Sequence, residues 1–242
     1  MRLLVLVGLA ALTLAAEETP LDSGPTSLII TYRCNPAQRA QFRQNLMGAG
    51  LQRFQHWKED GVLSEYHVLF SRYVDTDSWD AMTILHFSNY TNLQRWKRVE
   101  TATPAGITPE MLAMTTSVNT YPVDLARRAI DESIPAEPVF LVIPYSQAPS
   151  YDDFVRYVDN VLKPQFDGTM KAGILFGYGV YMQRYPAARP WDSLVVLEYK
   201  SDDDFGAREK VISSVRQQMQ VNDQPVAQER QAVIADELVL RR

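Results

Sequence analysis

The chain resembles itself when it is displaced by 112 positions, and this internal similarity is its most constraining feature. Residues 28–89 align with residues 140–201 without a gap, and about eleven positions are identical. The identical pairs are Phe42/Phe154, Phe54/Phe166, Gly61/Gly173, Leu63/Leu175, Tyr66/Tyr178, Val68/Val180, Arg72/Arg184, Tyr73/Tyr185, Trp79/Trp191, Asp80/Asp192 and Leu85/Leu197. A chain that repeats its apolar pattern in this way is predicted to build the same kind of unit twice.

Both copies predict the same order of secondary structure, β-α-β-β-α-β. A short apolar run is followed by a segment with apolar residues at helical spacing, residues 36–60 in the first copy and 151–171 in the second. Each segment ends just before a glycine, Gly61 or Gly173, which is suited to a helix C-terminus. Two strands then form a hairpin, and a second helix and a closing strand follow. The predicted strands are 28–33, 62–73, 79–87 and 115–123 in the first copy, and 140–145, 174–185, 191–199 and 231–240 in the second.

This order of elements, with the repeated Arg-Tyr, five residues, Trp-Asp block, resembles the dimeric α/β-barrel (ferredoxin-like) superfamily. NIPSNAP-like and antibiotic-biosynthesis-monooxygenase-like proteins are among its members. The resemblance implies an α+β fold of two tandem ferredoxin-like βαββαβ repeats, paired within one chain as an intrachain dimeric α/β-barrel-like pseudo-dimer with a pocket between the sheets. The expected boundaries are 17–124 for the first repeat, 125–138 for a linker and 139–242 for the second repeat.

The N-terminus is predicted to be a signal peptide. Residues 1–16 carry one arginine and then an almost wholly apolar run, and Glu17 and Glu18 begin the polar chain. The run is too short to span a bilayer, so we expect a secreted or periplasmic protein with no transmembrane segment in the mature chain. Cys34 is the single cysteine and cannot form an intrachain disulfide. The formal charge of -5, without a basic run, excludes nucleic-acid binding as a class.

The Tyr73/Trp79 and Tyr185/Trp191 pairs predict a register for the two hairpins. That register places Arg72 opposite Asp80 and Arg184 opposite Asp192, which predicts two structural ion pairs. An anion clamp is the alternative role for these arginines.

The same register places Tyr66 with His86 in the first copy and Tyr178 with Glu198 in the second. If this face lines the barrel, a phenol, an imidazole and a carboxylate converge there as a candidate acid-base set. If it packs on the helices, these groups are polar strand ends. The opposite face is mixed and aromatic, as a pocket for an apolar ligand would be, and it carries Glu65, His67, Leu69, Tyr73, Trp79, Tyr181 and Trp191.

Three hypotheses of function follow from these patterns. The first is the binding of a small, largely apolar molecule between two antiparallel sheets, with Tyr66, Tyr73, Trp79, Tyr178, Tyr181 and Trp191 as ligand-binding residues. The second is a cofactor-independent oxygenase or isomerase that uses His86, His67, Tyr66 or Glu198. The third is a scaffold whose barrel is filled by side chains. No cofactor is expected. No metal site is expected either, because no two histidines are spaced i, i+4 and no Cys or carboxylate cluster is evident.

Overall fold

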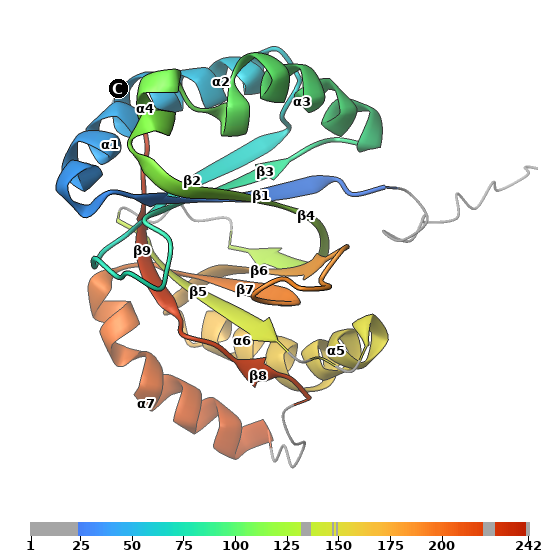
Figure 1. The fold of residues 1–242 in the computed structure, drawn as a ribbon. Helices are drawn as coiled ribbons and strands as arrows, with labels where there is room; N and C mark the ends of the chain where they lie inside the picture. Colours follow the sequence, from blue (N-terminus) through green and yellow to red (C-terminus); the bar gives the residue numbers. More distant parts are fainter. Residues whose placement is uncertain (1–23, 132–136, 147, 149, 220–225, 241–242) are drawn as a thin grey trace, which may run out of the picture.

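The computed structural model describes residues 24–131, 137–146, 148, 150–219 and 226–240 (Figure 1). The predicted signal peptide, residues 1–16, lies outside the described residues. In the described part of the chain, no helix is both long and apolar enough to cross a membrane.

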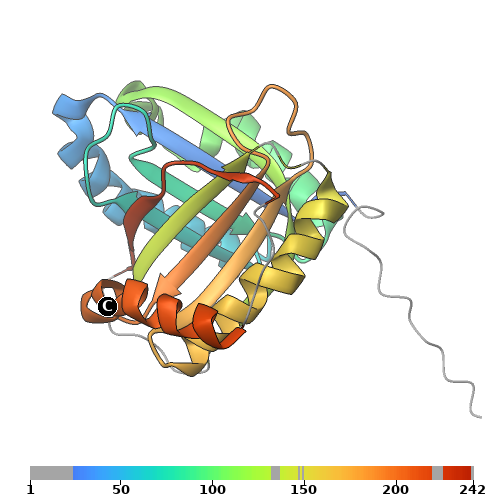
Figure 2. The ribbon, with the colours of Figure 1, turned by 90° about the horizontal axis from the view of Figure 1, so that it is seen from below.

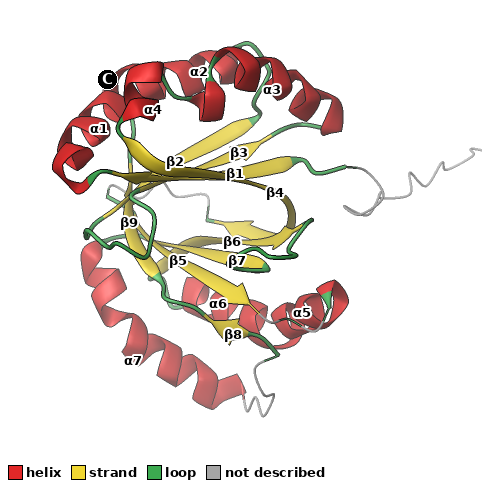
Figure 3. Cartoon of the chain, in the orientation of Figure 1, coloured by secondary structure: helices red, strands yellow, loops and turns green. Residues whose placement is uncertain are grey.

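After β1, helical segments alternate with pairs of consecutive strands along the described chain (Figure 3). The strands are β1 Ser27–Cys34, β2 Glu65–Ser71, β3 Ala81–His86, β4 Thr115–Ile130, β5 Val139–Ser146, β6 Leu175–Gln183, β7 Ser193–Tyr199, β8 Gln228–Glu229 and β9 Val233–Glu237. The α-helices are α1 Arg39–Asn45, α2 Leu51–Glu59, α3 Tyr90–Ala102, α4 Pro109–Ala113, α5 Tyr151–Tyr157, α6 Lys163–Lys171 and α7 Asp202–Met219. The π-helical turns Leu46–Gly50 and Val158–Leu162 join α1 to α2 and α5 to α6.

Local sequence explains where several helices begin and end. The side chains of Asn89 and Ser150 accept hydrogen bonds from backbone N–H groups in the first turns of α3 and α5, which satisfies donors that a helix start leaves free. Gly61 and Gly173 follow α2 and α6 with φ of 66° and 87°, a conformation that glycine adopts without a Cβ clash. The two predicted C-terminal glycines are therefore confirmed.

The strands close into one antiparallel barrel, and this corrects the expected fold class of two ferredoxin-like repeats. The order is β7-β6-β4-β1-β3-β2-β9-β5, and β5 pairs with β7 to close the circle. The short β8 pairs with the end of β5, along the same edge as β9. Pairing of β4 with β6 and of β2 with β9 joins the two halves of the chain by hydrogen bonds. Eight strands thus form one closed structure instead of two separate repeat sheets placed face to face.

Closure depends on a strand that is longer than predicted. β4 does not end at Val123 but continues through Ile130, so residues 125–130, assigned to the linker, are strand. Its second part pairs with β6, from Val123 opposite Gln183 to Ile130 opposite Gly177. Pairing in this way satisfies backbone groups that two open sheets would leave at their edges.

Helices cover the barrel on two opposite sides, which gives the molecule three apolar cores. The helices α1–α4 lie over the strands of the first half, and α5–α7 lie over those of the second half (Figures 1 and 2). One core lies under each helical layer, around Phe42 and Phe54 on one side and Phe154 and Phe166 on the other. The third core lies inside the barrel itself.

The register of both hairpins differs from the predicted one by a single residue. Tyr66 lies opposite Leu85 and not opposite His86, and Tyr178 lies opposite Leu197 and not opposite Glu198. Because side chains alternate between faces, a shift of one residue exchanges the partners on both faces. The predicted pairing of Tyr66 with His86 and of Tyr178 with Glu198 is therefore wrong.

Candidate functional site

The barrel interior has two chemically different ends, which an apolar layer separates. Each of the eight barrel strands contributes one buried side chain to this layer: Ile29, Leu69, Ile84, Val123, Val142, Tyr181, Val196 and Ala235. On β3, Met82 lies at one end of the barrel and His86 at the other, roughly 13 Å apart at about 3.3 Å per residue. A group bound at one end therefore does not contact side chains at the other.

One end holds an aromatic cavity of about 600 Å³. Trp79, Tyr121 and Trp191 form part of its wall, and Met82 and Leu194 are apolar residues that line it. The rings of Tyr121 and Trp191 lie 4.7 Å apart between centroids. This volume and lining are those of a pocket for a small molecule, with aromatic surfaces on which a planar ligand can stack.

The charged groups at the cavity are mainly cationic. Arg33 donates from Nε to the carbonyl of Ser78 at 3.0 Å, and no carboxylate pairs with it among the described residues. Arg230 lines the cavity too, and Arg189 lies 5.4 Å from the centre of the Tyr121 ring. Asp77 is the one carboxylate on the described wall. In a chain of net charge -5, this local excess of guanidinium groups favours an anionic oxygen on the ligand.

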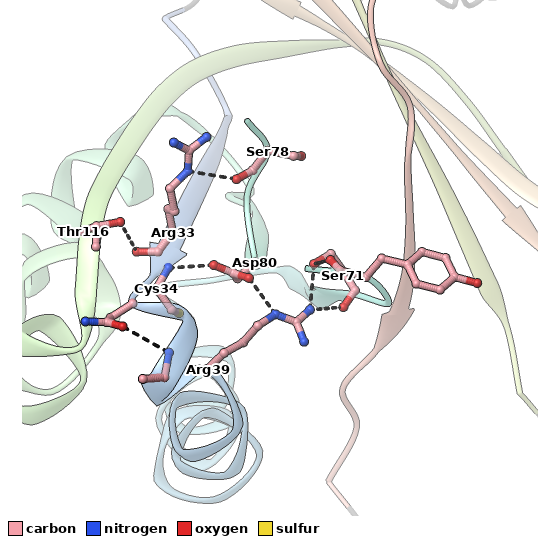
Figure 4. Close-up of polar contacts among 10 residues, drawn as sticks. Arg33, Cys34, Arg39, Ser71, Ser78, Asp80 and Thr116 are labelled. Carbon is pink, nitrogen blue, oxygen red and sulfur yellow. Dashed lines mark hydrogen bonds and ion pairs between the residues drawn. The ribbon is translucent and has the colours of Figure 1, made fainter. Parts of the chain in front are cut away.

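A buried carboxylate next to the cavity anchors the segment that carries Trp79 (Figure 4). Asp80 accepts a hydrogen bond from Arg39 Nε at 2.6 Å and another from the backbone N–H of Cys34 at 2.7 Å. Arg39 in turn donates to the hydroxyl of Ser71 at 2.9 Å. These bonds join the ends of β1, β2 and β3 and the start of α1, and they hold the aromatic wall in place.

The two predicted ion pairs have other partners in the structure. Asp80 pairs with Arg39, whereas Arg72 pairs with Asp236 at 2.7 Å and with Asp202. The shifted register is the reason. Arg72 lies just beyond the end of β2, where its backbone N–H donates to the carbonyl of Ile234 in β9.

In the second hairpin, Arg184 pairs with Asp124 of β4 at 3.0 Å. Asp192 accepts a hydrogen bond from the backbone N–H of Ala148. Each arginine thus joins different strands of the barrel and does not fix the register of its own hairpin.

The opposite end of the barrel holds a cluster of polar and charged side chains from six strands. We call it the polar cluster, and its members are Glu65, His67, His86, Arg128, Tyr181, Glu198 and Glu237. His67 bonds through Nδ1 to Glu237 at 2.8 Å and through Nε2 to Glu65 at 3.2 Å. Arg128 donates to both oxygens of Glu65. The cluster thus combines three carboxylates, two imidazoles and one guanidinium.

Burial and close charges shift the titration of this cluster in different directions. Burial lowers the pKa of His67, but its bonds to Glu237 and Glu65 outweigh burial and raise that pKa to about 9. Burial lowers the pKa of His86 to about 4, because the charged imidazole loses its hydration. Burial also raises the pKa of Glu198 to about 7, with a further contribution from Glu237.

The structure divides the predicted site residues among four places. His67, His86, Glu198 and Tyr181 meet in the polar cluster, and Trp79 and Trp191 line the aromatic cavity. Tyr66 and Tyr178 belong to the helix-covered cores, where their hydroxyls donate to Gln55 and Asp167 at 3.2 and 3.1 Å. Tyr73 is 69 % exposed. None of the four candidate catalytic residues lines the aromatic cavity.

Sequence reasoning missed several residues that the structure brings to these two ends: Arg33, Tyr121, Arg128, Arg230 and Glu237. Two of them, Tyr121 and Arg128, lie on β4, in the strand that closes the barrel. Tyr121 lies in the predicted strand 115–123, but nothing in the sequence showed that it faces a cavity. Arg128 lies in the segment assigned to the linker, where two adjacent arginines break the alternation of polar and apolar residues.

Comparisons with known proteins show the fold. No protein-family profile and no curated protein sequence matches this chain. Several solved structures match at a TM-score above 0.5. A candidate monooxygenase from Fusobacterium nucleatum has a TM-score of 0.56 and 11 % identity, and the match covers 90 % of this chain and 94 % of that one. An anthrone oxidase-like protein has a TM-score of 0.51 and 12 % identity over 91 % and 93 %. A heme-binding protein from Thermus thermophilus has a TM-score of 0.51 and 13 % identity over 89 % and 91 %.

At these identities the similarity establishes a shared fold. The similarity goes no further than the fold, so the superfamily and the finer NIPSNAP-like assignment stay predictions. The expectation of no cofactor is contradicted, because one protein of this fold is described as heme-binding.

The residues of this chain fit heme poorly. Of the residue types that bind heme iron, the described wall of the aromatic cavity offers only Met82 and Tyr121. Burial raises the pKa of Tyr121, which keeps its phenol protonated. His67 faces a cavity of about 30 Å³, too small for a macrocycle, and His56 is exposed beside Asp60.

Proposed function

We propose that this chain binds a small planar molecule with an anionic or phenolic oxygen in the aromatic cavity and oxidises it with molecular oxygen. The observation that carries the proposal is the cavity of about 600 Å³, which combines three aromatic rings with the guanidinium group of Arg33. The oxygenase class is supported by the shared fold with a candidate monooxygenase and an anthrone oxidase-like protein.

The cavity supplies binding, orientation and charge stabilisation. A planar substrate stacks between Trp79, Tyr121 and Trp191, and the apolar floor removes its reacting carbon from bulk water. Arg33 lies where it can bind an oxygen of the substrate and favour its deprotonated form. That anion is the form that most readily gives an electron to oxygen. For an anthrone-type methylene, the balanced reaction converts the CH2 group and O2 into a ketone and water.

The polar cluster is excluded from this reaction by its position. The apolar layer separates His67, His86 and Glu198 from the cavity. The proposed chemistry therefore uses residues of the aromatic cavity and not the acid-base set expected from the sequence.

The test measures binding and turnover separately. Quenching of tryptophan fluorescence by an anthrone or a dihydroxynaphthalene reports binding, and an oxygen electrode with product mass spectrometry reports oxidation. The variant Arg33→Gln should lose at least about tenfold in turnover, because one guanidinium contact to an anion is worth about 1.5 to 3 kcal/mol. Trp191→Leu should weaken binding.

Arg98→Gln is the matched control, since Arg98 is an exposed arginine on α3, a helix on the outer side of the barrel. Binding with no oxygen uptake by the unmodified protein would leave a binding protein and refute the oxygenase. No binding of either probe type would refute the ligand class.

We further propose that the protein is exported, on the basis of the apolar N-terminal segment of residues 1–16. Edman sequencing of protein recovered from the periplasm or the medium tests this. A chain that retains Met1 and stays in the cytosol would refute it.

A further inference from the structure

The geometry of the polar cluster points to a binding site for one divalent transition-metal ion, and we propose that Glu65, His67 and His86 are its protein ligands. The site lies at the end of the barrel away from the aromatic cavity and is independent of the function proposed there. Its class of ligand is a first-row divalent ion such as Zn²⁺, Fe²⁺ or Mn²⁺.

The three side chains converge because of their register on neighbouring strands. Glu65 of β2 lies directly opposite His86 of β3, and His67 follows Glu65 by two residues on the same face of β2. One ligand atom from each of the three residues lies within 4.8 Å of the other two. The Nε2 atom of His67 and the Oε1 atom of Glu65 are 3.2 Å apart. When two ligand atoms each lie about 2.0 to 2.2 Å from the same ion, the distance between the two ligand atoms is close to this value.

The outer hydrogen bonds have the arrangement that metal sites use. Glu237 binds Nδ1 of His67 at 2.8 Å, and Ser27 binds Nδ1 of His86 at 3.0 Å. Both imidazoles are thereby held with Nε2 toward the interior, which is the orientation that a carboxylate or hydroxyl partner gives to a metal-binding histidine. Arg128 binds the carboxylate of Glu65 and fixes it, and a carboxylate has enough lone pairs to accept an arginine and still bind an ion.

A small cavity beside one of the three ligands, His67, leaves room for an open coordination position. Two histidines and one carboxylate leave further positions free, which favours iron or a similar ion over a closed structural site. His67, Arg128, Tyr181 and Glu198 line a cavity of about 30 Å³. That volume holds one or two water molecules and excludes a larger ligand. No sequence motif indicated this site, because its ligands come from adjacent strands and not from one helix.

The test uses the full-length chain without a histidine tag, stripped with a chelator. Zn²⁺ and Co²⁺ are added in calorimetric titrations, and the visible spectrum of the Co²⁺ form is recorded. We expect one ion per chain and Co²⁺ absorption bands typical of four or five ligands. The variants Glu65→Gln and His86→Asn should lose at least about 100-fold in affinity, and Glu237→Gln should lose about 10- to 100-fold because it orients a ligand.

His56→Gln is the matched control and should bind like the unmodified protein. His56 is the one histidine outside the proposed site, and its side chain is 68 % exposed. If a ligand variant does not fold, histidine labelled with ¹⁵N in the unmodified protein decides the question. Zn²⁺ should shift the imidazole signals of two of the three histidines. Failure to bind one ion, or equal binding by folded Glu65→Gln, would overturn the proposal and leave the cluster as an ion-pair network.

Discussion

Replacing Glu198 by glutamine should stabilise the metal-free protein above neutral pH. Glu198 lies among Glu237 of β9, Glu65 and His67 of β2, and Arg128 of β4, and burial raises its pKa from 4.5 to about 7. A native carboxyl group with a raised pKa holds its proton more tightly than the unfolded chain does. Stability therefore falls as the pH rises from about 4.5 to about 7 and is constant above that range with respect to this group.

The difference between the two pKa values corresponds to a loss of about 3 kcal/mol in the free energy of unfolding once Glu198 is fully ionised. Because the side chain of Glu198 is only partly buried, water screens part of this cost. We therefore expect the ionised carboxylate to lower the free energy of unfolding by about 1 to 2 kcal/mol. Urea unfolding with EDTA present, at pH 4.5 and pH 8.5, measures the effect. Glu198→Gln should gain this amount over the unmodified protein at pH 8.5 and much less at pH 4.5. Glu209→Gln, at a carboxylate that is 78 % exposed, is the control. An equal effect of Glu198→Gln at both pH values would refute the argument.

Four further predictions concern folding and the single thiol. Asp80→Asn should lower the free energy of unfolding by about 2 to 4 kcal/mol, because it leaves the guanidinium of Arg39 without its buried carboxylate; urea unfolding measures this. Gly61→Ala should cost about 1 to 2 kcal/mol, since φ is 66° there. Gly106→Ala should cost at least about 1 kcal/mol more in the same assay, because its new Cβ would lie 3.2 Å from two aromatic rings. The thiol of Cys34, whose pKa burial raises to about 12, should react with Ellman's reagent slowly in native protein and rapidly in urea.

Local sequence signals predicted the positions of most elements. The apolar spacing in residues 151–171 gave the combined span of α5, the π-helical turn and α6, and the glycines at 61 and 173 marked the ends of α2 and α6. These signals depend on neighbouring residues, so one sequence is enough to find them.

The closure of the barrel depends on contacts between distant segments and left no comparable signal. The pairing of β4 with β6 brings Val123 opposite Gln183, and that of β2 with β9 brings Leu69 opposite Glu237. The polar composition of residues 124–131 was consistent with a linker. In the structure, residues 124–130 are the second part of β4, and the polar side chains of Arg127 and Arg128 bind Asp159 and Glu65.

The one-residue error in register has a physical origin in the barrel itself. A strand with one face in water alternates between apolar and polar residues, and this alternation fixes which residues point inward. In this chain one face of each hairpin packs on helices and the other fills the barrel, so Val68, Leu69 and Phe70 are all buried, as are Ile84 and Leu85. The apolar pattern therefore fits either register.

Only the charged residues at the strand ends distinguish the two registers. In the barrel interior, Glu65 bonds to His67, and His86 bonds to Ser27 and Tyr181. The predicted register would have placed His86 beside Tyr66 on the helix-covered face. Burying an imidazole there without the partners it has in the barrel would cost free energy that the apolar residues do not recover. The polar cluster, whatever ion it binds, is thus also the part of the sequence that selects the observed pairing of the first hairpin.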